Sequence, residues 1–115
     1  MTDHFEDRAR RAEDARRRVT HASADEALAA GARTVVDVRD PAEYDADHLD
    51  GAVNLPVDEI EARAAELLPD RDAPVVTYCN GGGRGSLGAD TLTRLGYTDV
   101  VNLDGGLRGV RGQDG

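Results

Sequence analysis

Residues 74–86 have the sequence PVVTYCNGGGRGS, and this stretch decides both the fold class and the candidate site. The β-branched run at residues 74–78 predicts a short buried strand. The single cysteine of the chain, Cys79, follows that strand directly. The glycines after it predict a turn into a helix at residues 86–95. A buried strand that leads through a glycine-rich turn into a helix is typical of α/β proteins.

The rest of the chain continues this alternation of strands and helices. β-Branched runs predict further strands at residues 34–38, 52–55 and 99–103. Capping patterns and amphipathic spacing predict helices at residues 3–18, 23–31 and 58–68, and another after Asp40. This spacing predicts an α/β fold with a largely parallel central sheet and helices on both faces.

Three segments are expected along the chain. Residues 1–18 form a charged helical extension, residues 19–110 form the folded domain, and residues 111–115 form a tail. The extension has opposite charges four residues apart but only a thin apolar stripe, which favours a solvated or frayed helix over one that docks a partner. The segment that begins at Gly105 has few side chains that can pack.

Composition limits the function classes. The 115 residues suffice for one domain, and the net charge of -9 argues against a nucleic-acid or anionic-membrane partner. The acidic excess lies in residues 21–115, where eight arginines face 18 acidic residues. No apolar run predicts a membrane span, and the first 20 residues lack the apolar core of a secretory signal. A single cysteine excludes an internal disulfide, so we expect a reducing cytoplasm as the location.

The chemistry of the loop follows from its residue types. Three consecutive glycines, Gly81, Gly82 and Gly83, let backbone N–H groups turn inward, and the next helix directs its positive end at the same space. Arg84 adds a full charge. Together these groups favour the thiolate of Cys79, a nucleophile, and the same cradle can bind an oxyanion or a sulfur anion. The alternative is a buried structural cysteine beside a flexible loop. The combination of features favours the reactive cysteine.

Spacing separates two kinds of cysteine chemistry. Four residues lie between Cys79 and Arg84, one fewer than in protein tyrosine phosphatases. The pattern Cys-x-x-Gly-x-Arg, here Cys79, Gly82 and Arg84, resembles the active loop of the rhodanese family of sulfurtransferases. The resemblance covers roughly residues 19–107. It includes the segments Asp37-Val38-Arg39, 44–56, Gly96-Tyr97 and 103–106.

This resemblance implies a small rhodanese-like domain with the activity of a thiosulfate sulfurtransferase. Sulfur would move from thiosulfate or a similar anionic donor, through a persulfide on Cys79, to cyanide or a thiol, without a metal or organic cofactor. A protein that accepts the sulfur is a further expected partner. Arg84 would bind the donor, together with the backbone of Asn80, Gly81, Gly82, Gly83 and Gly85.

Two further groups near the loop admit alternative roles. Asp37 and Arg39 end the strand at residues 34–38, so we expect an ion pair that braces the loop; direct donor binding by Arg39 is the bolder alternative. For His48, a hydrogen bond to the backbone is favoured over a role as general base. His4 and His21 lack ligand-like spacing, so no metal site is expected.

Three functions therefore remain open. The first is a thiosulfate-type sulfurtransferase. The second is a persulfide sulfur carrier or sulfide-handling protein that serves a protein or a low-molecular-weight thiol. The third, a cysteine phosphatase or arsenate reductase, is disfavoured by the spacing of Cys79 and Arg84.

Overall fold

A computed structural model describes residues 4–112, with side chains from residue 7 onward. The expected N-terminal extension and C-terminal tail therefore lie partly outside it, because residues 1–3 and 113–115 are not among the described residues. Within the described part of the chain, no helix is both long and apolar enough to cross a membrane.

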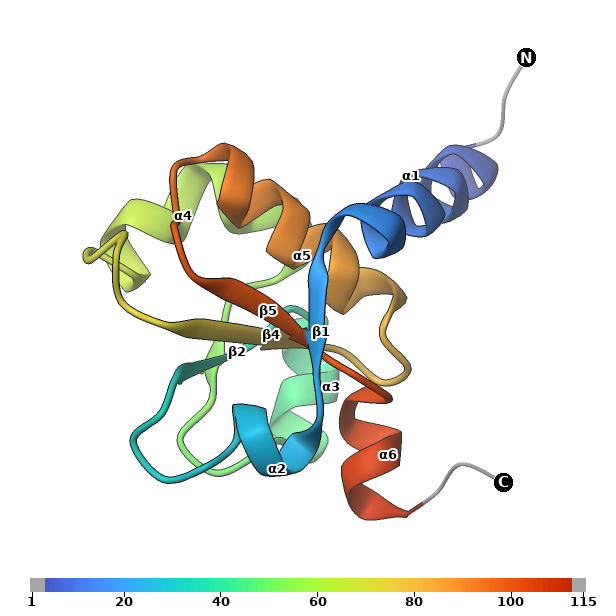
Figure 1. Ribbon diagram of the computed structural model, residues 1–115. Coiled ribbons are helices and arrows are strands. Elements are labelled where there is room, and N and C mark those ends of the chain that lie inside the picture. The colour runs from blue at the N-terminus through green and yellow to red at the C-terminus, as the bar shows by residue number, and fades with distance from the viewer. Residues whose placement is uncertain (1–3, 113–115) are drawn as a thin grey trace.

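A five-stranded sheet forms the centre of the molecule (Figure 1). Its spatial order is β1-β5-β4-β2-β3, and every neighbouring pair of strands is parallel. The predicted α/β class with a largely parallel sheet is confirmed. The strands are β1 (Thr20–Ala22), β2 (Thr34–Asp37), β3 (Val53–Asn54), β4 (Val75–Tyr78) and β5 (Val100–Leu103).

Helices lie on both faces of this sheet (Figure 1). On one face are α4 and α5, with α1 packed on α5; on the other are α2, α3 and α6. The helices are α1 (His4–Arg18), α2 (Ala24–Ala27), α3 (Pro41–Ala46), α4 (Ile60–Leu67), α5 (Gly83–Arg94) and α6 (Gly106–Arg111), and a 3-10 turn, η1 (Val57–Glu59), precedes α4.

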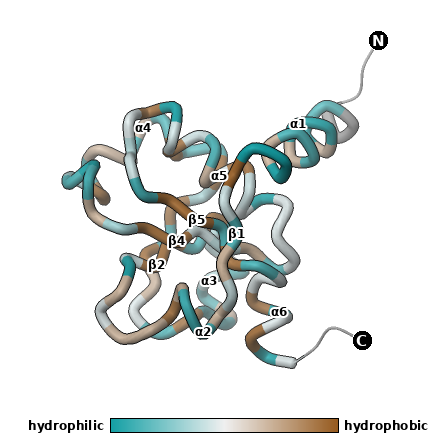
Figure 2. The backbone as a smooth tube through the Cα atoms, in the orientation of Figure 1, coloured by the Kyte–Doolittle hydropathy of each residue, from teal (hydrophilic) through white to brown (hydrophobic). Residues whose placement is uncertain are grey.

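The core consists of two aliphatic clusters, one on each side of the sheet. β4 contributes to both, because successive strand residues point to opposite faces: Val75 joins the cluster under α4 and α5, and Val76 joins the other. All four residues of β4 are buried. The apolar colour accordingly concentrates in the central strands, whereas α1 is largely hydrophilic (Figure 2).

The strand order reverses its direction between β2 and β4. The chain leaves β2 for β3 and leaves β4 for β5, so the two connections diverge in opposite directions. α3 follows β2 on one face, and α5 follows β4 on the other. In parallel α/β sheets, ligand sites form beyond the carboxyl ends of the strands at such a point. The residues that follow Asp37 and Tyr78 meet there.

Some elements differ from the sequence-based expectations; α2, for example, ends at Ala27 and not at Gly31. β1 was not predicted, because this three-residue edge strand is mostly exposed and has no apolar alternation. α5 begins at Gly83, before the predicted start at Ser86, and Gly82 is its N-cap.

The N-terminal helix packs more closely than expected. Ala15 is 0% exposed, and the guanidinium of Arg18 donates two hydrogen bonds of 2.8 and 3.2 Å to the carboxylate of Asp90 on α5. The favoured interpretation of a solvated or frayed helix is therefore wrong for this part of α1. Small alanine side chains let α1 approach α5 despite its weak apolar stripe.

The C-terminal segment also packs against the domain, through its backbone. The N–H groups of Leu107 and Arg108 donate to the carbonyl oxygens of Cys79 and Asn80, at 2.8 and 3.1 Å. Leu107 is only 6% exposed. The prediction that this segment has little to pack is wrong, because main-chain hydrogen bonds to the loop after β4 hold the start of α6 in place.

We expect Gly106→Ala to destabilise the protein by about 2–4 kcal/mol. Gly106 has a φ of +59°, and a Cβ there would lie 2.5 Å from the carbonyl oxygen of Cys79 and 2.6 Å from that of Asn80. Urea unfolding measures the effect. Gly109→Ala is the matched control, since Gly109 is an exposed residue of the same helix and alanine there should stabilise by roughly 0.5–1 kcal/mol. A wild-type unfolding midpoint for Gly106→Ala would show that α6 does not depend on this close approach.

Candidate active site

Cys79 lies at the carboxyl end of β4, beside the point in the sheet where the strand order reverses. It is only 3% exposed, yet it lines a cavity of about 440 Å³. Its Sγ accepts a hydrogen bond of 3.0 Å from the N–H of Gly82. The sulfur therefore lies in the wall of a cavity with an amide proton directed at it, and is not sealed beneath the sheet.

Gly82 shapes the turn that carries this amide. Its φ of +120° lies in a region that only glycine adopts readily. Its carbonyl oxygen accepts hydrogen bonds from both the N–H and the Oγ of Ser86, at 2.9 and 2.7 Å, which closes the first turn of α5. This arrangement places the Gly82 N–H on the Cys79 side of the turn.

The other predicted loop residues divide into two groups. The same cavity as Cys79 is lined by Asn80, Gly81, Gly83 and Arg84. Gly85 lies away from that lining, buried in α5, where a Cβ would come within 2.2 Å of Asn102 Oδ1. The absence of a side chain at Gly85 lets α5 pack against β5.

The guanidinium of Arg84 is paired with a carboxylate of α3. Its Nη1 donates to Glu43 Oε1 at 2.7 Å and its Nη2 to Oε2 at 3.0 Å. Such two-pronged pairs are among the stronger hydrogen-bonded contacts in proteins. Glu43 also accepts a hydrogen bond of 3.2 Å from the backbone N–H of Asp40, the N-cap residue of α3.

Glu43 is ionised throughout the physiological range. The hydrogen bond from Arg84, followed by those from the Asp40 backbone and the Asn80 side chain, lowers its pKa to about 2. The Glu43 carboxylate therefore balances the charge of Arg84 beside Cys79.

A buried ion pair at the end of β2 contacts the loop that follows β4. Arg39 is 4% exposed and Asp37 0% exposed, and Nε and Nη2 of Arg39 donate to the Asp37 carboxylate at 2.7–3.2 Å. Nη1 of Arg39 donates to Asn80 Oδ1 at 3.1 Å, and Nη2 also donates to the carbonyl oxygen of Asp47. Each nitrogen of Arg39 thus has a protein acceptor. The side chain contacts the loop through Asn80, and it is not among the residues that line the cavity of Cys79.

Tyr78 completes this network. Its hydroxyl donates to Asp37 Oδ2 at 2.7 Å and accepts from the N–H of Leu49 at 3.0 Å. Burial raises the pKa of Tyr78 above its ordinary value, so the hydroxyl keeps the proton that it donates to Asp37.

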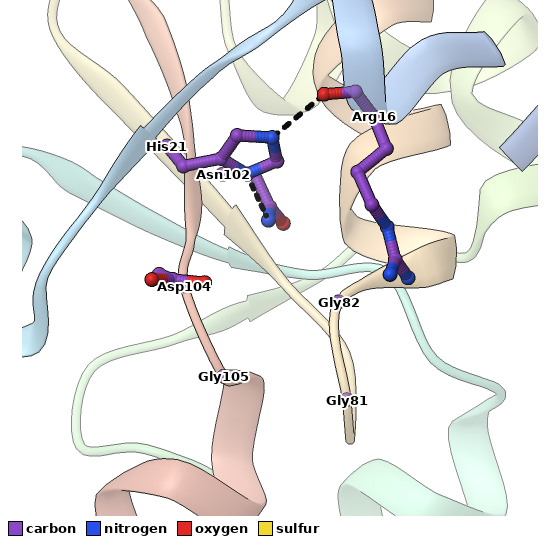
Figure 3. A pocket seen from close by; sticks show the side chains of 7 residues that line it. All are labelled: Arg16, His21, Gly81, Gly82, Asn102, Asp104 and Gly105. Carbon is purple, nitrogen blue, oxygen red and sulfur yellow. Dashed lines mark hydrogen bonds between the residues drawn. The ribbon is translucent and has the colours of Figure 1, made fainter. Parts of the chain in front are cut away.

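Gly81 and Gly82 also line a second cavity, of about 310 Å³, together with residues that include Arg16, His21 and Asn102 (Figure 3). There His21 joins three elements: its Nε2–H donates to the carbonyl oxygen of Arg16 at 2.8 Å, and its Nδ1 accepts from Asn102 Nδ2 at 3.0 Å. Among the described residues, the buried Asn102 Oδ1 has no hydrogen-bond partner. These contacts hold the end of α1 and the strand β1 against β5, beside the loop.

His48 lies outside the cavity that Cys79 lines. Its Nδ1 donates to the carbonyl oxygen of Tyr44 at 2.8 Å, and its ring stacks on that of Tyr44 with centroids 3.8 Å apart. The favoured interpretation, a hydrogen bond to the backbone, is confirmed. Within the described part of the chain, no three His, Cys, Asp or Glu side chains are grouped so that they could hold a metal ion.

Sequence reasoning missed the residues that complete the cavity of Cys79. Besides the loop and Leu87, its lining comprises Arg8, Ala9 and Ala12 of α1 and Arg108 of α6. The alanine spacing on α1 was a visible signal, but it did not say which surface the helix contacts. Arg108 had no local signal.

The sequence and the fold of this chain are similar to those of known sulfurtransferases. A model of the rhodanese-like domain matches residues 20–113. Thiosulfate sulfurtransferase PspE of Escherichia coli strain K12 is 39% identical over 75 residues, 65% of this chain and 71% of PspE. The putative sulfur carrier protein YrkF of Bacillus subtilis strain 168 is 33% identical over 79 residues, 69% of this chain but only 42% of YrkF. The human single-domain sulfurtransferase TSTD1 superposes with a TM-score of 0.72 at 29% identity, covering 83% of this chain and 97% of TSTD1.

We expect Glu43→Gln to lower the free energy of unfolding by about 1–2 kcal/mol at neutral pH, because Arg84 loses a charged partner that is partly solvent-screened. The folded pKa of Glu43 is depressed, so its stabilisation is present above the ordinary value of 4.5 and is lost as the pH falls towards about 2. Urea unfolding at a series of pH values should therefore show a wild-type advantage that is constant at neutral pH and shrinks in acid. Glu66→Gln, at an exposed residue of α4, is the control and should change stability little. An advantage that persists undiminished in acid would contradict the ion pair.

Proposed function

The chain belongs to the rhodanese-like domain family of sulfurtransferases, and on this premise we propose that it transfers sulfane sulfur from thiosulfate or a similar donor to cyanide or a thiol through a persulfide on Cys79. The observation that supports this proposal most is the hydrogen bond from the Gly82 N–H to Cys79 Sγ in the wall of a cavity also lined by Arg84. An amide directed at the sulfur stabilises negative charge on it and on an atom attached to it.

In the first half-reaction, the thiolate of Cys79 attacks the outer sulfur of thiosulfate. A new S–S bond forms as the S–S bond of thiosulfate breaks, and sulfite leaves with the electron pair. The persulfide that remains carries its negative charge on the outer sulfur. The Gly82 N–H and the N-terminal end of α5 stabilise that charge, and Arg84 holds the sulfonate end of the donor.

In the second half-reaction, an acceptor attacks the outer sulfur. The persulfide bond breaks, and its electron pair returns to Cys79 as the thiolate. A thiol acceptor attacks as its thiolate, after its proton has passed to solvent, and leaves as a persulfide anion. Cyanide, formed when hydrogen cyanide releases its proton to solvent, leaves as thiocyanate. The steps need no external oxidant, reductant, metal or organic cofactor. Two half-reactions through one covalent intermediate imply ping-pong kinetics.

The second candidate is a sulfur carrier that passes the same persulfide sulfur to a protein or a small thiol. The similarity to YrkF, named as a putative sulfur carrier, favours keeping it. Its turnover with cyanide would be poor, and its turnover with thiols or a protein acceptor would be fast. A cysteine phosphatase is less favoured, because the gap between Cys79 and Arg84 is too short by one residue.

We expect incubation with thiosulfate to add the mass of one sulfur atom to the protein, because Cys79 retains the transferred sulfur. Intact-mass spectrometry measures the addition, and cyanide should remove it. Cys79→Ser is the control and should gain no sulfur. Hydrolysis of an aryl phosphate without any added sulfur would instead support a phosphatase.

We expect Arg84→Ala to lower kcat/KM for thiosulfate by about 10- to 100-fold, the range for losing one hydrogen bond to a charged group. Steady-state sulfite release measures the change. The variant also leaves the Glu43 carboxylate without its partner, and this carboxylate would repel the anionic donor. The double variant Arg84→Ala/Glu43→Gln removes that repulsion, so that the loss of donor binding is measured alone. Unchanged donor kinetics in Arg84→Ala would remove Arg84 from the site.

A further inference from the structure

The cavity of Cys79 has a wall that lies outside the family match. α1 (His4–Arg18) precedes the matched residues 20–113, yet Arg8, Ala9 and Ala12 line the cavity. The loop lies close to this wall, since a Cβ on Gly83 would be 3.9 Å from the Cβ of Ala12. α1 is therefore part of the candidate site of this chain.

The lining is partly apolar and partly cationic. Ala9, Ala12 and Leu87 offer an aliphatic surface, and the arginines are Arg8 and Arg108 in addition to Arg84. A volume of about 440 Å³ lies within the range of sites for small organic molecules. An occupant with a short carbon chain and an anionic group matches both parts of the lining.

Within the described part of the chain, two of these three arginines have no carboxylate closer than 3.8 Å. Arg84 is paired with Glu43. Among the side chains that the structure describes, the carboxylate paired with Arg8 is that of Asp58, at the long distance of 3.8 Å, and the Asp58 side chain is 80% exposed. Arg108 is exposed, and no carboxylate among the described residues lies within 4.0 Å of its guanidinium. These two charges are a local exception on a chain whose net charge is -9.

We propose that Arg8 and Arg108 make this site selective for acceptor thiols that carry an anionic group on a short aliphatic chain. This inference rests on the proposed sulfurtransferase function. The thiol sulfur attacks the outer sulfur of the Cys79 persulfide, the chain lies along Ala12 and Leu87, and the anionic group lies between the two arginines.

The test uses the second half-reaction alone. The protein is persulfidated with thiosulfate, freed of excess donor, and mixed with either 3-mercaptopropionate or 3-mercapto-1-propanol, which differ in charge but hardly in size. Intact-mass spectrometry follows the loss of sulfur with time. The readout is the second-order rate constant for 3-mercaptopropionate divided by that for 3-mercapto-1-propanol. We expect this ratio to fall by about fivefold in Arg8→Gln/Arg108→Gln. The intrinsic reactivities of the two thiols cancel when this ratio is compared between proteins.

Three controls sharpen the result. Arg10→Gln removes an exposed arginine of α1 that is not part of the cavity lining, and should leave the ratio unchanged. Arg8→Glu should raise the rate constant for cysteamine, a cationic thiol, relative to that for 3-mercaptopropionate. An ionic strength of about 1 M, where the Debye length is roughly 3 Å, should lower the ratio in the wild-type protein.

The outcomes separate the two proposals. If thiosulfate adds no sulfur to Cys79, the proposed function fails, and this inference fails with it. If the persulfide forms but the ratio is the same in the wild type and the double arginine variant, the inference alone is overturned. A persulfide that no small thiol removes would also overturn it, and would favour a protein acceptor.

Discussion

The guanidinium of Arg39 joins the ends of two strands, and the geometry of the site depends on that contact. It pairs with Asp37 at the end of β2 and donates to the Asn80 side chain just beyond β4. A buried ion pair adds little net stability, but loss of one partner leaves an uncompensated charge inside the protein. With the Tyr78 hydroxyl also bonded to Asp37, displacement of the loop would break several buried polar contacts at once.

From Asn80 the same network continues to the charges around the sulfur. The Asn80 side chain donates to Glu43, and Glu43 holds Arg84. On the other side, the backbone of α6 occupies the carbonyl oxygens of Cys79 and Asn80. The carbonyl oxygens of Cys79 and Asn80 are thus bonded to α6, whereas the N–H of Gly82 is directed at the sulfur. The separation of donors from acceptors gives a site suited to an anionic intermediate.

Charge is distributed unevenly over this acidic chain. The net charge of -9 opposes the approach of anions over long distances. The cavity of Cys79 nevertheless gathers arginines from α1, α5 and α6. At short range, these arginines act on a ligand directly, whereas the acidic charges farther away are screened by salt. The placement of these arginines therefore gives the cavity a cationic lining on an acidic chain.

The sequence by itself determined the α/β class, four of the five strands and the loop that contains Cys79, because β-branched runs, caps and glycine turns act over a few neighbouring residues. It missed β1 and α6, which are held mainly by backbone pairing with distant segments. Only the tertiary structure decided that Glu43 pairs with Arg84, 41 residues away, and that α1 forms a wall of the cavity. Such contacts depend on where the strand order brings chain segments together, and a linear pattern of residue types does not encode that position.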